Sequence, residues 1–265
     1  MKRWHLACSA TGVSRWPLAS VVLLAVACGG HDSPTSTSSA GPPLSEQIET
    51  AAFLFRFSAG DSIDVARQQA FHDWAPGRLG VPVPRRITYN KYLSRAHMGQ
   101  IIGVSNTNAW ADRTAFAIHT IWPFDNHETV HLYASVIGDP PALLSEGLAV
   151  SMQTDPASGD FDPKWSGVRL DDLARRFRAG GALAPIDRML QTSDFRNLDP
   201  NISYPEAGSF VHFLVEAHGL DRFKMLYARG GPNDPAAAVR AAFADVYGLS
   251  VADLEAEWWR VLGIS

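Results

Sequence analysis

Two histidines four residues apart, His127 and His131, constrain this chain more than any other feature of its sequence, because Glu128 stands beside the first of them. On a helix, residues i and i+4 lie on one face, so both imidazoles can direct a nitrogen at the same point. That geometry fits a zinc ion. A tetrahedral catalytic zinc takes three protein ligands and keeps one position for water, so a third ligand is expected from elsewhere in the chain.

Glu146 is the expected third ligand. It follows His131 at a distance that leaves room for about two more helical turns, a Gly-Asp-Pro-Pro turn at 138–141, and a second helix that returns the carboxylate. The alternative is an ordinary amphipathic helix whose two histidines are solvated or hydrogen-bonded in the core. That alternative leaves the Glu-Gly pair at 146–147 without a role.

The residues around the two histidines also indicate a helix. Pro123 precedes the motif, Asp125 or Asn126 can cap the N-terminus, and the motif is followed by Leu132 and Val136, which continue an apolar face. We therefore expect a helix to begin just before the first histidine.

The segments His-Glu-Thr-Val-His (127–131) and Leu-Leu-Ser-Glu-Gly-Leu-Ala (143–149) resemble the zinc motifs of the gluzincin metallopeptidases, more closely of the peptidase MA-like proteins of bacteria. The segment 204–214 looks like the tyrosine-containing helix of that group, and 242–258 resembles its helical C-terminal ending. The resemblance covers residues 50–263. One departure is Val150, because thermolysin-like enzymes place an acidic residue there, so the support of the zinc ligands is expected to differ.

The resemblance implies a fold of the α+β class that is thermolysin-like or gluzincin-like. A small N-terminal mixed sheet lobe would carry the zinc helix, and a mainly helical lobe would follow it. A single peptidase MA-like catalytic domain is expected over 45–265, with the α+β lobe at 45–137 and the helical lobe at 138–265.

The resemblance also implies an activity, the hydrolysis of peptide bonds with Zn²⁺ as the cofactor. Zinc held by His127, His131 and Glu146 would lower the pKa of its bound water toward about 7 and polarise the scissile carbonyl. Glu128, adjacent to the ligands but not one of them, would take the water proton and later give it to the leaving amine.

A developing oxyanion needs a hydrogen-bond donor besides the metal. Tyr204 is the expected donor, because the resemblance places a tyrosine in this region, and His212 is the alternative. A buried tyrosine is more often only a packed aromatic with a satisfied hydroxyl. An alternative function is also open, a zinc-retaining binding or scaffold lipoprotein without turnover.

The first 28 residues differ in composition from the rest. They contain three cations and then an apolar run at 18–27, which is shorter than the about 20 residues that a membrane-spanning helix needs. This pattern predicts a signal peptide. Cys28 at its end resembles the lipidated cysteine of a bacterial lipobox, although Ala25 stands where Leu is more usual, and the alternative is cleavage nearby with Cys28 as an unmodified thiol.

Residues 29–44 are rich in Ser, Thr, Pro and Gly and predict a flexible tether. The chain has 23 Lys and Arg against 27 Asp and Glu, and removal of 1–28 takes away three cations and no acid, so the net charge falls from −4 to −7. No basic surface for nucleic acid is expected. We expect an exported protein facing the periplasm or the cell exterior, anchored to the membrane only through Cys28, with a peptide or protein as its substrate.

Hydrophobic periodicity predicts the elements of the first lobe, which are strands 53–57 and 85–93, a helix at 61–74, and a pair of strands at 103–106 and 114–120. By the resemblance, 114–120 would form the cleft edge, where an extended peptide can add backbone hydrogen bonds; the alternative is an interior strand.

Helical spacing predicts the following helices in the second lobe: 170–179, 205–218, 221–228, 235–247 and 251–262. The polar, proline-containing loops 154–167 and 192–203 are expected at the rim of the cleft.

Overall fold

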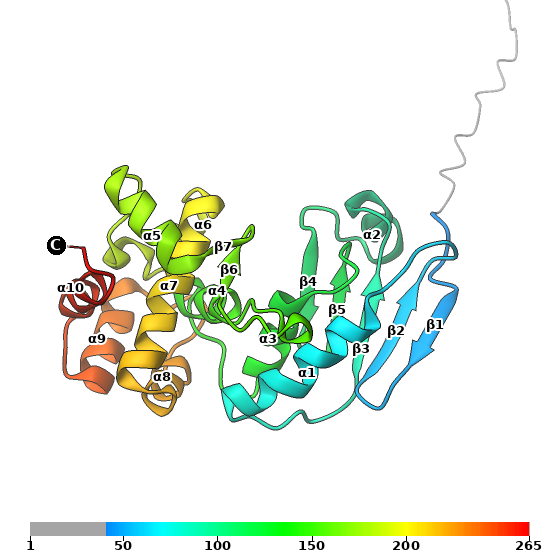
Figure 1. The fold of residues 1–265 in the computed structure, drawn as a ribbon, viewed down its shortest axis with the longest axis horizontal. Helices are drawn as coiled ribbons and strands as arrows, with labels where there is room; N and C mark the ends of the chain where they lie inside the picture. The colour runs from blue at the N-terminus through cyan, green and yellow to red at the C-terminus, as the bar shows by residue number, and fades with distance from the viewer. Residues whose placement is uncertain (1–40, 265) are drawn as a thin grey trace, which may run out of the picture. The chain divides into compact units, whose positions relative to one another are not determined.

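The computed structural model describes residues 41–264 (Figure 1). The predicted signal peptide, Cys28 and the tether up to residue 40 lie outside the described residues. All described residues belong to one compact unit of the chain, Ala40–Ser265. Within them, no helix combines the length and the apolar character that crossing a bilayer requires.

A five-stranded mixed sheet forms the N-terminal part, in the order β1-β2-β3-β5-β4 (Figure 1). Its strands are β1 (Glu46–Glu49), β2 (Phe53–Phe57), β3 (Ile87–Lys91), β4 (Ala109–Asp112) and β5 (Ala117–Thr120). β2, β3 and β5 run parallel, whereas β1 and β4 pair antiparallel with their neighbours at the two edges. The parallel step from β2 to β3 needs a crossover, which contains α1 (Val65–Leu79).

One face of the sheet is buried because apolar side chains alternate along β2. Phe53 and Phe55 are fully buried, whereas Arg56 is exposed. Phe55 pairs with Tyr89 of β3, and Tyr89 pairs with Ile118 of β5. The strand register therefore extends the apolar face across all three parallel strands.

The predicted strand at 103–106 is wrong, because the chain there leaves a helix. This helix, α2 (Arg95–Ile102), is capped by Ser94, whose side chain accepts a hydrogen bond from the backbone N–H of His97. Gly103 ends it with a φ of 76°, in the left-handed region that suits a glycine after a helix. The glycine is thus a helix stop, and the edge strand β4 begins only at Ala109.

The predicted strand at 114–120 is present but lies inside the sheet. β5 begins at Ala117 and runs between β3 and β4, so β4 is the edge strand on that side of the sheet. Asp112 turns the chain between these two strands, because its side chain accepts hydrogen bonds from the backbone N–H groups of Thr114 and Ala115. The strand is therefore interior, as in the alternative, and β4 forms the edge on this side of the sheet.

Helices make up most of the chain after the sheet, as its periodicity predicts. They are α3 (Asn126–Ala134), α4 (Ala142–Ser151), α5 (Leu170–Ala179), α6 (Thr192–Arg196), α7 (Pro200–His218), α8 (Leu220–Tyr227), α9 (Ala236–Tyr247) and α10 (Val251–Val261). The loops contain a hairpin, β6 (Lys164–Trp165) with β7 (Val168–Arg169), and the 3₁₀ turns η1 (Pro156–Ser158) and η2 (Ile186–Met189). The predicted α+β class is confirmed.

The segment 192–203, predicted as a loop, is largely helical. It holds α6 and the first turn of α7, which begins at Pro200 and continues through Pro205. Asp199 caps α7 by accepting a hydrogen bond from the backbone N–H of Asn201, and proline is favoured in the first helical turn. α7 therefore starts one turn before the predicted position.

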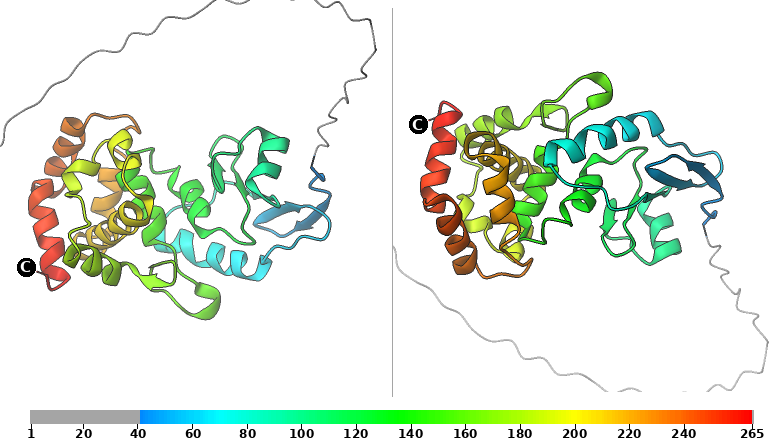
Figure 2. Two further views of the ribbon diagram at one scale, coloured as in Figure 1. Left: turned by 90° about the horizontal axis from the view of Figure 1, so that it is seen from above. Right: turned by 90° about the horizontal axis from the view of Figure 1, so that it is seen from below.

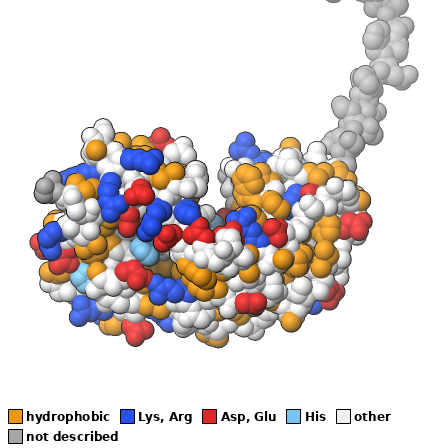
Figure 3. Space-filling view, viewed as in Figure 1, with side chains coloured by type: hydrophobic (Ala, Val, Ile, Leu, Met, Phe, Trp, Pro, Cys, Tyr) orange, Lys and Arg blue, Asp and Glu red, His pale blue; other side chains and the backbone are white. Residues whose placement is uncertain are grey.

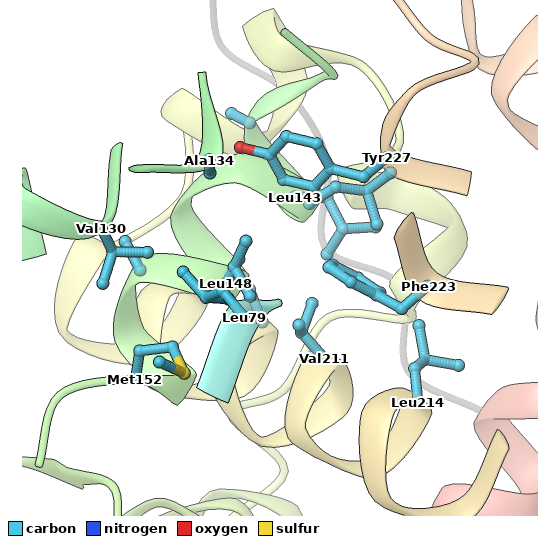
Figure 4. Packing of buried hydrophobic residues seen from close by; sticks show 14 of the residues in the cluster. Leu79, Val130, Ala134, Leu143, Leu148, Met152, Val211, Leu214, Phe223 and Tyr227 are labelled. Atoms are coloured by element: carbon cyan, nitrogen blue, oxygen red, sulfur yellow. The ribbon is translucent and has the colours of Figure 1, made fainter. Parts of the chain in front are cut away.

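α4 is buried along its whole length and packs against α7. Figures 1 and 2 show α3 and α4 between the sheet and the helices α5 to α10. Figure 4 shows Leu148 of α4 beside Val211 of α7, with Phe223 and Tyr227 of α8 close by. All four side chains are buried, so this core fixes the position of α4.

Candidate metal centre

The N-terminus of α3 is held by the buried side chain of Asp125. One carboxylate oxygen accepts the backbone N–H of Glu128 at 3.0 Å, and the other accepts the hydroxyl of Thr120 at 2.8 Å. Asp125 is therefore the helix cap, which resolves the choice between Asp125 and Asn126. The bond to Thr120 ties the cap to the end of β5.

Gln68 of α1 holds the same helix from its other side. Its amide nitrogen donates to the hydroxyl of Thr129 at 2.9 Å, and its amide oxygen accepts the backbone N–H of Asp125 at 2.9 Å. The side chains of Gln68 and Thr129 are fully buried, so water cannot replace these hydrogen bonds. The network fixes the direction in which α3 leaves the sheet and hence where His127 points.

Glu146 lies in the second turn of α4, and both Glu146 and His131 are buried. The Oε2 atom of Glu146 is 3.1 Å from Nε2 of His127 and 3.2 Å from Nε2 of His131. The two Nε2 atoms are 3.2 Å apart. The structure therefore brings together the three residues that the sequence predicts as ligands.

These three distances test whether the residues fit a metal ion. Ligand atoms about 2.0–2.1 Å from a tetrahedral ion stand roughly 3.3–3.4 Å from one another. The three donor atoms are already close to that spacing, so the group can hold a metal ion. Two imidazoles and one carboxylate form a donor set common in catalytic zinc sites.

The charges of the ligands balance one another. Burial by itself lowers the pKa of His127, but the hydrogen bond to Glu146 and the nearby carboxylates outweigh it and raise the pKa to about 9. Burial raises the pKa of Glu146, yet His131 and His127 outweigh it and hold the pKa well below its usual range.

Glu128 lines the same cleft as the three ligands. Burial raises the pKa of its carboxyl group, and the charges of Asp125 and Glu146 add to this effect, while His131 and His127 oppose it. A carboxylate whose pKa moves toward neutrality is suited to accept a proton and return it.

Tyr204 of α7 also lies in the cleft, with its ring centroid 6.3 Å from that of His127. Burial raises the pKa of its hydroxyl, so Tyr204 keeps its proton at neutral pH. His212, the alternative donor, lines a separate cavity of about 40 Å³ together with Trp74 and Phe161. The structure thus brings Tyr204 to the ligands and places His212 elsewhere.

Arg196 is a residue of the site that the sequence did not single out. It lies in α6, and its Nη2 donates to Oε1 of Glu146 at 2.8 Å. The only signal in the sequence is its position within 192–203, which is predicted to border the cleft. The side chain of Arg196 points toward Glu146 because α6 packs against α4.

The ligands lie in a cleft of about 1280 Å³. One wall is the edge strand β4 with the loop before it and the exposed side chains of Trp110 and Trp122. The opposite wall includes Trp165, Arg196 and Tyr204. The space-filling view shows a hollow over these elements with charged side chains along its base (Figure 3).

Comparisons with models of protein families, with curated proteins and with solved structures found no match in any of the three.

Proposed function

We propose that this chain is a zinc-dependent peptidase of the gluzincin type with a thermolysin-like arrangement of its lobes. The observation that carries the proposal is the position of Glu128, which shares one cleft with His127, His131 and Glu146. Ligands alone would serve a structural ion equally well. A free carboxylate next to them supplies the base that hydrolysis needs.

His127, His131 and Glu146 would hold the zinc ion, which when bound would acidify water and polarise the scissile carbonyl. Glu128 accepts a proton from the attacking water and returns it to the nitrogen of the leaving amine. The hydroxyl of Tyr204 donates a hydrogen bond to the carbonyl oxygen as it gains negative charge.

The shape of the cleft supports a peptide or protein substrate. An edge strand leaves backbone N–H and C=O groups unpaired, and β4 presents such an edge in the cleft wall. An extended peptide can pair with an exposed strand edge through its own backbone. We propose that the substrate lies along β4 outside the cytoplasm, with Cys28 as the membrane anchor.

Replacement of Glu128 by Gln tests the proposal. The variant should keep its zinc and lose hydrolysis of an unfolded protein substrate by roughly 10²–10⁴-fold, because the amide cannot accept the water proton. Glu216→Gln is the matched control, because this exposed residue of α7 pairs with Arg78 on the surface, away from the cleft.

A Glu128→Gln variant that cuts every substrate of the parent would overturn the assigned base. Zinc binding without hydrolysis by the parent, against a mixture of unfolded proteins, would favour the zinc-retaining scaffold instead.

A further inference from the structure

The carboxylate of Glu146 uses its two oxygens for different partners. Oε2 faces the two histidine nitrogens, whereas Oε1 accepts a hydrogen bond from Nη2 of Arg196 at 2.8 Å. Glu146 and Arg196 come from different helices, α4 and α6. The arginine therefore holds the oxygen that turns away from the histidines.

The exposure of the two side chains shows which of them needs the other. The side chain of Glu146 is 9% exposed and that of Arg196 is 55% exposed. A buried carboxylate without a partner is strongly unfavourable, whereas an exposed guanidinium can be solvated by water. The pair therefore matters more for the orientation of Glu146 than for that of Arg196.

No acidic residue supports the ligands from position 150. Val150 is fully buried and packs against Gly208 of α7, so this position of α4 belongs to the helix interface. Arg196 instead reaches the site from the wall of the cleft, and it bonds a ligand carboxylate directly.

Arg196 also connects Glu146 with Tyr204. Its Nη1 donates to the hydroxyl oxygen of Tyr204 at 3.3 Å. A hydroxyl that accepts a hydrogen bond from a cation keeps its own hydrogen for another acceptor. The bond therefore leaves the Tyr204 proton free to be donated within the cleft.

We propose that Arg196 is a positioning residue, which holds Glu146 with a single oxygen toward the histidines and Tyr204 with its O–H available. The proposal rests on the metal site of the proposed function. It does not depend on peptidase activity, because the orientation of Glu146 affects metal binding directly.

Two effects of Arg196 on metal affinity have opposite signs. Its positive charge repels a dication, so loss of the charge alone would strengthen metal binding. Its hydrogen bond orients a ligand, and loss of such a partner typically weakens metal binding by roughly 10–100-fold. The sign of the change therefore separates a positioning residue from a cation that merely lies nearby.

The test is the zinc affinity of the full chain, measured by competition with a chromogenic chelator, for the parent, Arg196→Ala and Arg196→Lys. We expect Arg196→Ala to bind zinc roughly 10–100-fold more weakly. Lysine keeps one donor but not the planar pair, so Arg196→Lys should recover part of the loss.

Arg67→Ala is the matched control. Arg67 lies in the same cleft and pairs at 2.9 Å with Asp155, which is not one of the three proposed ligands, so zinc affinity should not fall. The visible spectrum of the cobalt-loaded proteins gives a second readout, because it reports ligand geometry. We expect it to change in Arg196→Ala and to match the parent in Arg67→Ala.

Zinc affinity that is equal or higher in Arg196→Ala would overturn the proposal, as would equal losses in Arg196→Ala and Arg67→Ala. If Arg196→Ala does not fold, the zinc affinity of Arg196→Lys is compared with that of the parent. A weaker affinity supports the proposal, and an equal or higher affinity overturns it. A parent that binds zinc but cleaves no peptide would refute the peptidase and leave this inference standing.

Discussion

Gly147 of α4 lies so close to Ala207 of α7 that a Cβ atom at position 147 would stand 2.8 Å from the carbonyl oxygen of Ala207. The contact has a counterpart, because a Cβ atom at Gly208 of α7 would stand 2.5 Å from Cγ1 of Val150 of α4. The two helices therefore cross with their backbones almost in contact. Glu146 is next to the crossing, which explains why a glycine follows it.

Gly147→Ala should destabilise the protein by about 1–3 kcal/mol, because the added methyl group forces the two helices apart. The shift should also move Glu146 and weaken zinc binding. Gly77→Ala is the control, because Gly77 lies in α1 with nothing near its added Cβ, and alanine is the better helix former there. Denaturant unfolding of both variants measures their free energies of unfolding. Equal stability of Gly147→Ala and the parent would contradict the prediction.

His131→Ala should remove the stabilisation that zinc provides. A ligand present at about 100 times its Kd stabilises the folded state by about 2.7 kcal/mol, which raises Tm by roughly 5–10 °C in a chain of this size. We expect this increase in the parent and in His212→Ala, whose histidine lies in the separate cavity. Thermal unfolding with and without zinc makes the comparison, and a zinc-dependent increase in His131→Ala would show that the ligand assignment is wrong.

Thr129→Val should destabilise the protein by about 1–3 kcal/mol, because the buried amide of Gln68 and the carbonyl of Asp125 each lose a hydrogen-bond partner. Gln68→Leu removes the amide that bonds the Thr129 hydroxyl and the backbone N–H of Asp125. The two changes share a contact, so the double variant should lose less stability than the two single losses added together. Strict additivity in urea unfolding would argue against the network.

Glu206→Gln should stabilise the protein at high pH. Glu206 is fully buried in α7, and burial together with the charge of Glu255 raises its pKa to about 9. The unfolded chain releases this proton near pH 4.3, so stability falls by up to about 1.4 kcal/mol per pH unit as the pH rises from about 4.3 to about 9. Glutamine needs no proton and avoids this loss.

The check is the Tm of Glu206→Gln relative to the parent as a function of pH. We expect the difference in Tm to be small at about pH 4.3 and to exceed about 10 °C at about pH 9. The exposed control Glu216→Gln should show no such trend. A difference that does not grow with pH would mean that Glu206 is ionised in the folded protein.

The sequence alone determined the local parts of the site. The spacing of His127 and His131 places both rings on one helical face, and a cap at Asp125 or Asn126 starts that helix just before them. The Gly-Asp-Pro-Pro turn and the helix after it also pointed to Glu146 as the third residue of the group, although α3 ends at Ala134 and does not continue for the two further turns expected after His131. These features depend on residues a few positions apart, where helix and turn geometry leave few alternatives.

Only the tertiary structure decided the contacts between distant elements. Gln68 meets Thr129, and Arg196 meets Glu146, because of the way whole helices pack, which neither local segment encodes. The order of the sheet likewise made β4 the edge in the cleft wall and placed β5 inside. Strand order and helix packing depend on the burial of apolar faces across the whole chain, so they cannot be derived from residues close together in sequence.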